Sequence, residues 1–291
     1  MCDQDILKDM SEHLKATGAD LSRRSFGLLT AGAMIAALPR AANALDVKEQ
    51  DVEVKTKDGT ADAYFVAPSA GKHPAVIVWV DAFGLRPAFR QMGKRLAEAG
   101  YAVLIPNPYY RTAKASAIPQ GLDFNKPDDR AQLMKLMGGL NAGTHATDGA
   151  AYLEFVSKQA SVDNAKKVGT TGYCMGGAPV FRLAGMHPDR VGAAATFHGG
   201  GLVTDQPDSP HLQIPKMKAA LLVAIAESDD KTQPEAKTVL KDTFQKNNVK
   251  AEVEVYPAAH GWCPPDSAVY KQAEAEKAWS RLTAIFKPAL A

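Results

Sequence analysis

The stretch VGTTGYCMGG, residues 168–177, decides how the rest of the chain is interpreted. It joins an apolar run, typical of a buried strand, to a cysteine between glycines. The pattern Gly-x-nucleophile-x-Gly marks a sharp strand-to-helix turn that exposes its central side chain. Cys174 is therefore either a nucleophile or a small apolar side chain that fills a corner of the core. Three glycines around a core cysteine would cost backbone entropy without a packing reason, which favours the nucleophile.

The segments around this turn alternate between strand and helix patterns. Apolar runs predict strands at 75–80, 101–106, 167–173, 219–226 and 251–256, most of them buried on both faces. Helical patterns occupy 87–100, 128–137, 144–159, the segment after Cys174, 235–247 and 267–286. This alternation predicts one α/β domain with a mostly parallel sheet and helices on both faces.

Two further segments complete the predicted architecture. The alternating runs DVEVKT and ADAYFVAP flank residues 57–60, a turn signal, and predict an antiparallel hairpin at one edge of the sheet. Residues 106–126 have no regular pattern, and a loop of that length commonly covers a binding site or is mobile.

The composition indicates a globular protein and does not suggest a nucleic-acid partner. The chain has 291 residues, 46% of them apolar, and a formal net charge of +2, so it can bury a large core. It has no basic stripe and no Cys/His finger spacing, which argues against a nucleic-acid partner. His260 and Cys263 alone are too few for a zinc site, so we expect neither a metal nor a cofactor.

The first 44 residues have the pattern of an export signal. Arg23 and Arg24 precede the apolar segment 27–38, and Ala42-Asn43-Ala44 provides a small-residue cleavage site. This pattern resembles a twin-arginine signal, cleaved after Ala44, which leaves residues 45–291 as a periplasmic domain. Twelve residues are too few to span roughly 30 Å of hydrocarbon. The expected partner is thus the twin-arginine export machinery, with no stable membrane insertion after cleavage.

Side chains suited to one mechanism follow three of the predicted strands. Cys174 follows 167–173, Asp229 and Asp230 follow 219–226, and His260 follows 251–256. Ligands bind at the carboxyl ends of strands in open α/β sheets, and the order nucleophile, acid, histidine is that of α/β-hydrolases. In this interpretation His260 accepts the thiol proton and a carboxylate orients its ring. The amides of Met175 and Ala82 would bind the developing oxyanion.

Three assignments stay open from the residues alone. Spacing from the preceding strand favours Asp229 as the acid, whereas spacing to the following proline favours Asp230; we choose Asp229. His198 also follows an apolar strand, but it precedes the acid in the chain, so we interpret it as a strand-end histidine. Cys263 either approaches Cys174 closely enough for an inactivating disulfide or points away from it.

Five stretches, VGTTGYCMGG, AESDD, PAAHGW, AVIVWVDAFGL and NPYYR, are similar to the dienelactone hydrolase family over roughly residues 50–288. The resemblance implies a single-domain α/β-hydrolase that opens small lactones or esters through a Cys-His-Asp triad. Asp81 stands where the family has a glutamate that contacts the resting thiol. Arg130 matches one arginine that binds the substrate carboxylate, and Pro264 replaces the second.

Together these patterns predict an exported, cofactor-free cysteine hydrolase that acts on a small ester or lactone. Two alternatives come from other classes. One is a non-catalytic or redox-active thiol protein that retains the hydrolase fold. The other is a periplasmic small-molecule binding protein, which would retain a ligand without turnover.

Overall fold

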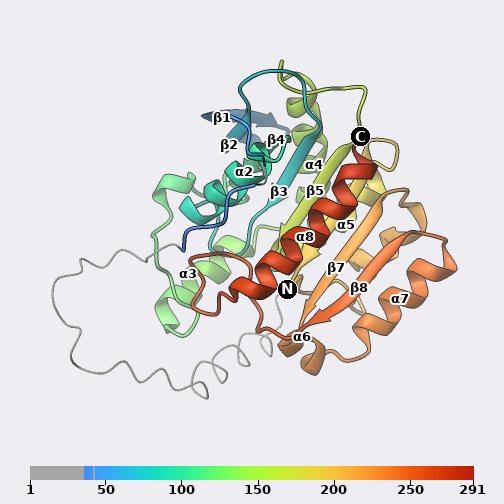
Figure 1. Cartoon of the computed structure of the whole chain (residues 1–291). Helices are drawn as coiled ribbons and strands as arrows, with labels where there is room; N and C mark the ends of the chain where they lie inside the picture. The colour runs from blue at the N-terminus through green and yellow to red at the C-terminus, as the bar shows by residue number, and fades with distance from the viewer. Residues whose placement is uncertain (1–35, 42) are drawn as a thin grey trace.

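Eight strands form one sheet in the computed structural model, which describes residues 36–41 and 43–291 (Figure 1). The strands are β1 (Val47–Thr56), β2 (Gly59–Pro68), β3 (Ala75–Trp79), β4 (Ala102–Pro106), β5 (Val168–Tyr173), β6 (Val191–Phe197), β7 (Ala220–Ala226) and β8 (Ala251–Tyr256). They lie in the order β1-β2-β4-β3-β5-β6-β7-β8. The strands from β4 to β8 run parallel, which confirms the mostly parallel sheet.

The predicted antiparallel hairpin lies at one edge of the sheet. Strand β1 pairs with β2 up to the contact between Thr56 and Gly59, so only two residues form the turn. Gly59 has a φ of 143°, a conformation that side-chain-bearing residues rarely adopt. Strand β2 continues antiparallel onto β4, so the hairpin extends the parallel sheet on one side.

Helices cover both faces of the sheet because strand side chains alternate in direction. The helices are α2 (Pro87–Glu98), α3 (Pro127–Met137), α4 (Ala142–Ser157), α5 (Gly177–Met186), α6 (Glu227–Thr232), α7 (Ala236–Lys246) and α8 (Gln272–Ala289). Ile77 of β3 packs in a cluster with residues of α4, α5 and α7. Its neighbours Val76 and Val78 pack in a second cluster with residues of α2 and α8. Each face of the sheet therefore has its own apolar core.

Two elements differ from the predicted pattern. The last helix was predicted over 267–286 but runs from Gln272 to Ala289. The amide of Lys271 donates to the carbonyl of Trp262 at 3.1 Å, which folds the preceding residues onto the loop after β8. Strand β8 is only half-buried along most of its length, because it pairs on one side alone.

The long segment after β4 contains a short 3-10 helix, Ala115–Ala117, and otherwise turns. The predicted export signal lies mainly outside the described residues, because residues 1–35 and 42 are not described. Of the helices in the described part of the chain, none is long and apolar enough to cross a membrane.

Candidate active site

The turn after β5 holds Cys174 in a strained conformation. Cys174 has a φ of 54° in the left-handed region, which costs energy for a residue with a side chain. A Cβ on Gly172 would lie 2.0 Å from the carbonyl oxygen of Gly176. A Cβ on Gly176 would lie 2.3 Å from the carbonyl oxygen of Trp79. The glycines therefore let the turn close tightly on its own strand and on the end of β3.

Cys174 begins the short 3-10 helix Cys174–Gly176, which leads directly into α5. The side chain is half-buried, so it remains accessible from solvent. A helix amino terminus favours negative charge, and this placement therefore suits a thiolate.

The two residues predicted to bind the oxyanion contact the same tyrosine. The hydroxyl of Tyr109 donates to the carbonyl of Ala82 at 2.8 Å. The same hydroxyl lies 3.4 Å from the sulfur of Met175. Tyr109 is buried, and it fixes the peptide that follows Ala82 beside the turn that carries Met175.

His260 and Asp229 form a hydrogen-bonded pair. Both carboxylate oxygens of Asp229 lie 2.9 Å from Nδ1 of His260. The amide of His260 donates to the hydroxyl of Ser228 at 2.9 Å, which fixes the histidine loop against the start of α6. An Nδ1 proton bound to the carboxylate leaves Nε2 as the atom that accepts a proton.

The alternative acid, Asp230, belongs to a different ion pair. Its Oδ2 accepts a hydrogen bond from Nζ of Lys237 at 2.7 Å. Because adjacent residues on α6 point in different directions, Asp229 alone of the two forms a hydrogen bond to His260 among the contacts of the described residues. The geometry therefore favours Asp229.

Sheet register brings these residues to one edge. Tyr173 at the end of β5 pairs with Phe197 of β6, Phe197 pairs with Ala224 of β7, and Ala226 pairs with Tyr256 of β8. The residues that follow these strand ends therefore lie along the carboxyl edge of the parallel strands. This is where ligands bind in open α/β sheets.

His198, the residue after β6, lies beside His260 and is fully buried. Its ring centre is 5.1 Å from that of His260 and 4.9 Å from that of Trp262, edge-on in both cases. Burial, followed by the charge of His260, lowers the pKa of His198 well below its ordinary value. His198 therefore stays neutral and supports the ring of His260, in agreement with its interpretation as a strand-end histidine.

Asp81 is bound to an arginine that the sequence patterns did not single out. Arg86 donates to Oδ1 of Asp81 at 2.6 Å and to Oδ2 at 2.9 Å. The amide of Phe83 also donates to Oδ1 at 2.9 Å. On its other side, Arg86 donates to both oxygens of Asp266, at 2.6 and 2.9 Å. Both carboxylate oxygens of Asp81 are thus engaged, and its predicted contact with the thiol stays a prediction.

The charge state of this cluster follows from its partners. Burial alone would lower the pKa of Arg86, but Asp81 and Asp266 together raise it above its ordinary value. Arg86 is therefore a permanent cation between two carboxylates. It could have been recognised from the sequence only if its contact with Asp266, 180 residues away, had been known.

Arg130 lies in the first turns of α3 with an exposed side chain. The position predicted for its counterpart holds Pro264, which carries no charge and is buried. The described residues therefore bring no pair of arginines together here, and a substrate contact by Arg130 stays a prediction.

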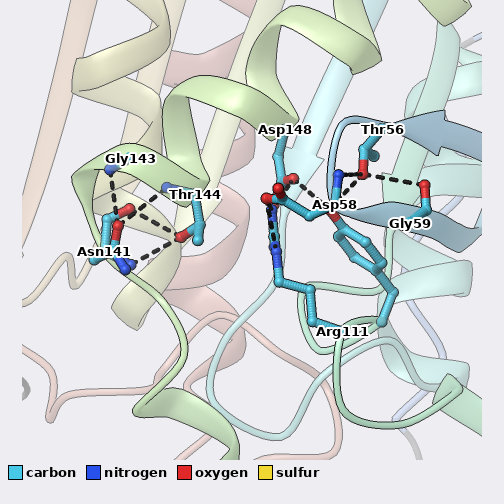
Figure 2. Close-up of polar contacts among 9 residues, drawn as sticks. Thr56, Asp58, Gly59, Arg111, Asn141, Gly143, Thr144 and Asp148 are labelled. Atoms are coloured by element: carbon cyan, nitrogen blue, oxygen red, sulfur yellow. Dashed lines mark hydrogen bonds and ion pairs between the residues drawn. The ribbon is translucent and has the colours of Figure 1, made fainter.

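The long loop after β4 is anchored by a different arginine. Arg111 donates to both oxygens of Asp148 on α4, at 2.6 and 3.0 Å, and to Asp58 in the β1–β2 turn at 2.7 Å (Figure 2). Asn141 caps the first turn of α4 by accepting from the amides of Gly143 and Thr144 (Figure 2). The segment that contains Tyr109 is thus tied to two elements of the fold.

No disulfide joins Cys174 and Cys263 in the described part of the chain. Cys263 is buried in the core beneath α2 and α8 and lines a cavity with Tyr173 and Phe197. Burial raises the pKa of the Cys263 thiol well above its ordinary value. The two thiols therefore differ in accessibility.

A search of the described residues for three or more clustered His, Cys, Asp or Glu side chains able to hold a metal ion finds none. The chemistry that these residues offer is a thiol at a strand-to-helix turn together with a carboxylate-oriented imidazole. These are the kinds of group that nucleophilic catalysis on an acyl group requires.

Comparisons with known proteins identify the family. The model of the dienelactone hydrolase family matches residues 61–290. A protein of Salmonella typhi, provisionally named a carboxymethylenebutenolidase, is 29% identical over 229 residues, which cover 76% of this chain and 80% of that protein. Carboxymethylenebutenolidase 1 of Cupriavidus pinatubonensis is 24% identical over 223 residues, 76% of this chain and 89% of that protein.

Solved structures agree on the fold. A Klebsiella pneumoniae protein, provisionally described as a dienelactone hydrolase, superposes with a TM-score of 0.71 at 22% identity, over 83% of this chain and 99% of that one. Because the family model covers well over half of the sequence, the chain belongs to the dienelactone hydrolase family and has the α/β-hydrolase fold.

Proposed function

We propose that the chain is an exported cysteine hydrolase that cleaves a small ester or lactone through a thioester intermediate. The observation that carries this proposal is the hydrogen bond between Asp229 and His260 at the same sheet edge as the strained Cys174 turn. Family membership supports the hydrolase class, and the names of the carboxymethylenebutenolidase relatives support a lactone or ester substrate.

Acylation begins when Nε2 of His260 takes the proton of Cys174. The thiolate sulfur attacks the substrate carbonyl, and the amides of Met175 and Ala82 stabilise the resulting oxyanion. As the C–O bond of the ester breaks, His260 returns the proton to the leaving alkoxide. In a lactone this alkoxide remains attached to the acyl group. The product of the step is a thioester on Cys174.

Deacylation uses the same groups with water as the nucleophile. His260 takes a proton from water, the hydroxide attacks the thioester carbonyl, and the C–S bond breaks. The proton then returns to the sulfur, which releases a carboxylic acid and restores the enzyme. Asp229 stabilises the imidazolium that forms in each half of the reaction.

Export is a separate part of the proposal and rests on Arg23, Arg24 and the Ala42-Asn43-Ala44 site. Replacing both arginines by lysine retains the charge but removes the pair that the export machinery recognises. We expect the full-length precursor to accumulate inside the cell, whereas the unchanged chain appears in the periplasmic fraction shortened after Ala44. Equal distribution of the two proteins would contradict the proposal.

A pre-steady-state assay with p-nitrophenyl acetate tests the catalytic proposal. We expect a burst of p-nitrophenol with an amplitude close to the enzyme concentration, followed by slower steady turnover. Cys174→Ala should show neither phase. Ester turnover in Cys174→Ala at the rate of the unchanged protein would refute the mechanism. Absence of turnover in the unchanged protein would instead favour a binding or redox role.

A further inference from the structure

We propose that Arg86 is a positioning residue that holds the loop carrying Ala82 against the loop carrying His260. This inference rests on the proposed function, because it concerns the relative placement of the oxyanion-binding amide and the general base. Arg86, Asp81 and Asp266 lie outside the Cys-His-Asp group.

The guanidinium of Arg86 joins two segments that are distant in sequence. On one side it forms a two-pronged contact with Asp81, the residue immediately before Ala82. On the other side it forms a two-pronged contact with Asp266, six residues after His260. A planar guanidinium has five N–H donors in a fixed fork, so it can hold two carboxylates in one defined geometry.

Arg86 is itself held rigidly. Arg86 is the residue immediately before the first turn of α2, and Pro87 follows at the first helical position. Its guanidinium carbon lies 4.9 Å from the ring centre of Phe89 and 5.4 Å from that of Phe83. Only 8% of the residue is exposed. The side chain of Arg86 therefore fixes both loops relative to the start of α2.

The consequence for catalysis is geometric. A nucleophile, a base and oxyanion donors work only when they converge on one substrate carbonyl, and a misplacement of about 1 Å can cost roughly 100-fold in rate. Without Arg86, Asp81 and Asp266 would leave two like charges close together and unpaired. Their repulsion would separate the Ala82 loop from the His260 loop.

The main test compares Arg86→Gln with Arg95→Gln in the full chain. Arg95 is a matched control, since it is also buried on α2 and forms a two-pronged contact with Glu276 at 2.6 and 2.7 Å. It also stacks on Trp279 at 4.2 Å, and its carboxylate partner Glu276 lies on α8 rather than on either loop of the site. We expect both variants to melt at lower temperature. Only Arg86→Gln should lower kcat, by roughly 10- to 100-fold, with KM changed less than about threefold.

Asp266→Asn provides a second variant that perturbs the core less, because Asp266 is partly exposed. We expect it to reduce kcat in the same direction as Arg86→Gln. Arg86→Lys retains the charge but lacks the fork, so it should recover the melting temperature better than it recovers kcat.

A readout that does not require turnover separates this inference from the proposed function. The rate at which iodoacetamide alkylates Cys174, followed against pH, reports the thiolate fraction that His260 supports. We expect the midpoint to rise in Arg86→Gln and Asp266→Asn and to stay unchanged in Arg95→Gln. Unchanged kcat and an unchanged midpoint in both Arg86→Gln and Asp266→Asn would overturn the proposal. Absence of ester turnover in the unchanged protein would refute the hydrolase function. The alkylation result would then decide whether Arg86 is a positioning residue.

Discussion

At the scale of single residues, two of the three cysteines in the chain, Cys174 and Cys263, have opposite surroundings. Cys174 is half-buried on a strained turn at a helix start, whereas Cys263 is buried among apolar side chains that raise its pKa. A thiolate is the reactive form of cysteine, so reactivity follows these surroundings rather than the residue type. Of these two cysteines, Cys174 is the nucleophile in the proposed mechanism.

Replacing Cys174 by alanine should abolish ester turnover and leave the melting temperature within a few degrees. One sulfur contributes little to packing, but it forms the covalent intermediate. Cys174→Ser should retain at most weak activity, because a hydroxyl ionises much less readily than a thiol. Steady-state kinetics and thermal unfolding on the same samples check both variants. As a matched control, Cys263→Ser should keep kcat close to that of the unchanged protein.

The two neighbouring aspartates should differ in their effect on catalysis. Asp229 contacts Nδ1 of His260, whereas Asp230 pairs with Lys237. Asp229→Asn removes the carboxylate that orients the ring, and a loss of kcat approaching 10⁴-fold is the scale known for such a change. Asp230→Asn should lower kcat less than about threefold. A reversed ranking in measured kcat would assign the acid to Asp230.

At the scale of elements, local patterns were predictable from the sequence, whereas contacts between distant segments were not. The central strands and α5 were predictable because they form long apolar or glycine-marked patterns in the sequence. The start of α8 was not, because it depends on a hydrogen bond from Lys271 to Trp262, outside any local pattern. Arg86 was not predictable either, since its second partner, Asp266, is distant in sequence.

Gly176→Ala should destabilise the fold and reduce activity together. The new Cβ would lie 2.3 Å from the carbonyl oxygen of Trp79, so the turn must move away from β3. We expect a loss of about 2 kcal/mol in the free energy of unfolding, measured by denaturant titration. Gly139→Ala is the control, because its nearest neighbour would be 3.9 Å away and no positive φ applies. Equal stability of the two variants would contradict this account of the turn.

At the scale of the whole molecule, the stability should depend on pH through buried His198. Burial holds its pKa well below the ordinary value, whereas in the unfolded chain it titrates near 6.5. Below about pH 6.5, His198 binds a proton in the unfolded state but stays neutral in the folded state. The folded state therefore loses stability as pH falls. A single such histidine contributes a slope of up to about 1.4 kcal/mol per pH unit.

His198→Phe should remove this contribution while keeping an aromatic ring beside Trp262. The free energy of unfolding of the unchanged protein should fall more steeply between pH 6.5 and 5 than that of His198→Phe. Denaturant titrations across this range measure the two slopes. Parallel curves would show that His198 accepts a proton in the folded protein.

The central claim, that Cys174 carries the acyl group, is tested most directly by mass spectrometry of the protein quenched in acid during turnover of p-nitrophenyl acetate. The account predicts an added mass of one acetyl group, about 42 Da, on the peptide that contains Cys174, and its loss on treatment with hydroxylamine, which cleaves thioesters. An acetyl group on any other residue, or turnover with no acylated protein at any quench time, would contradict it.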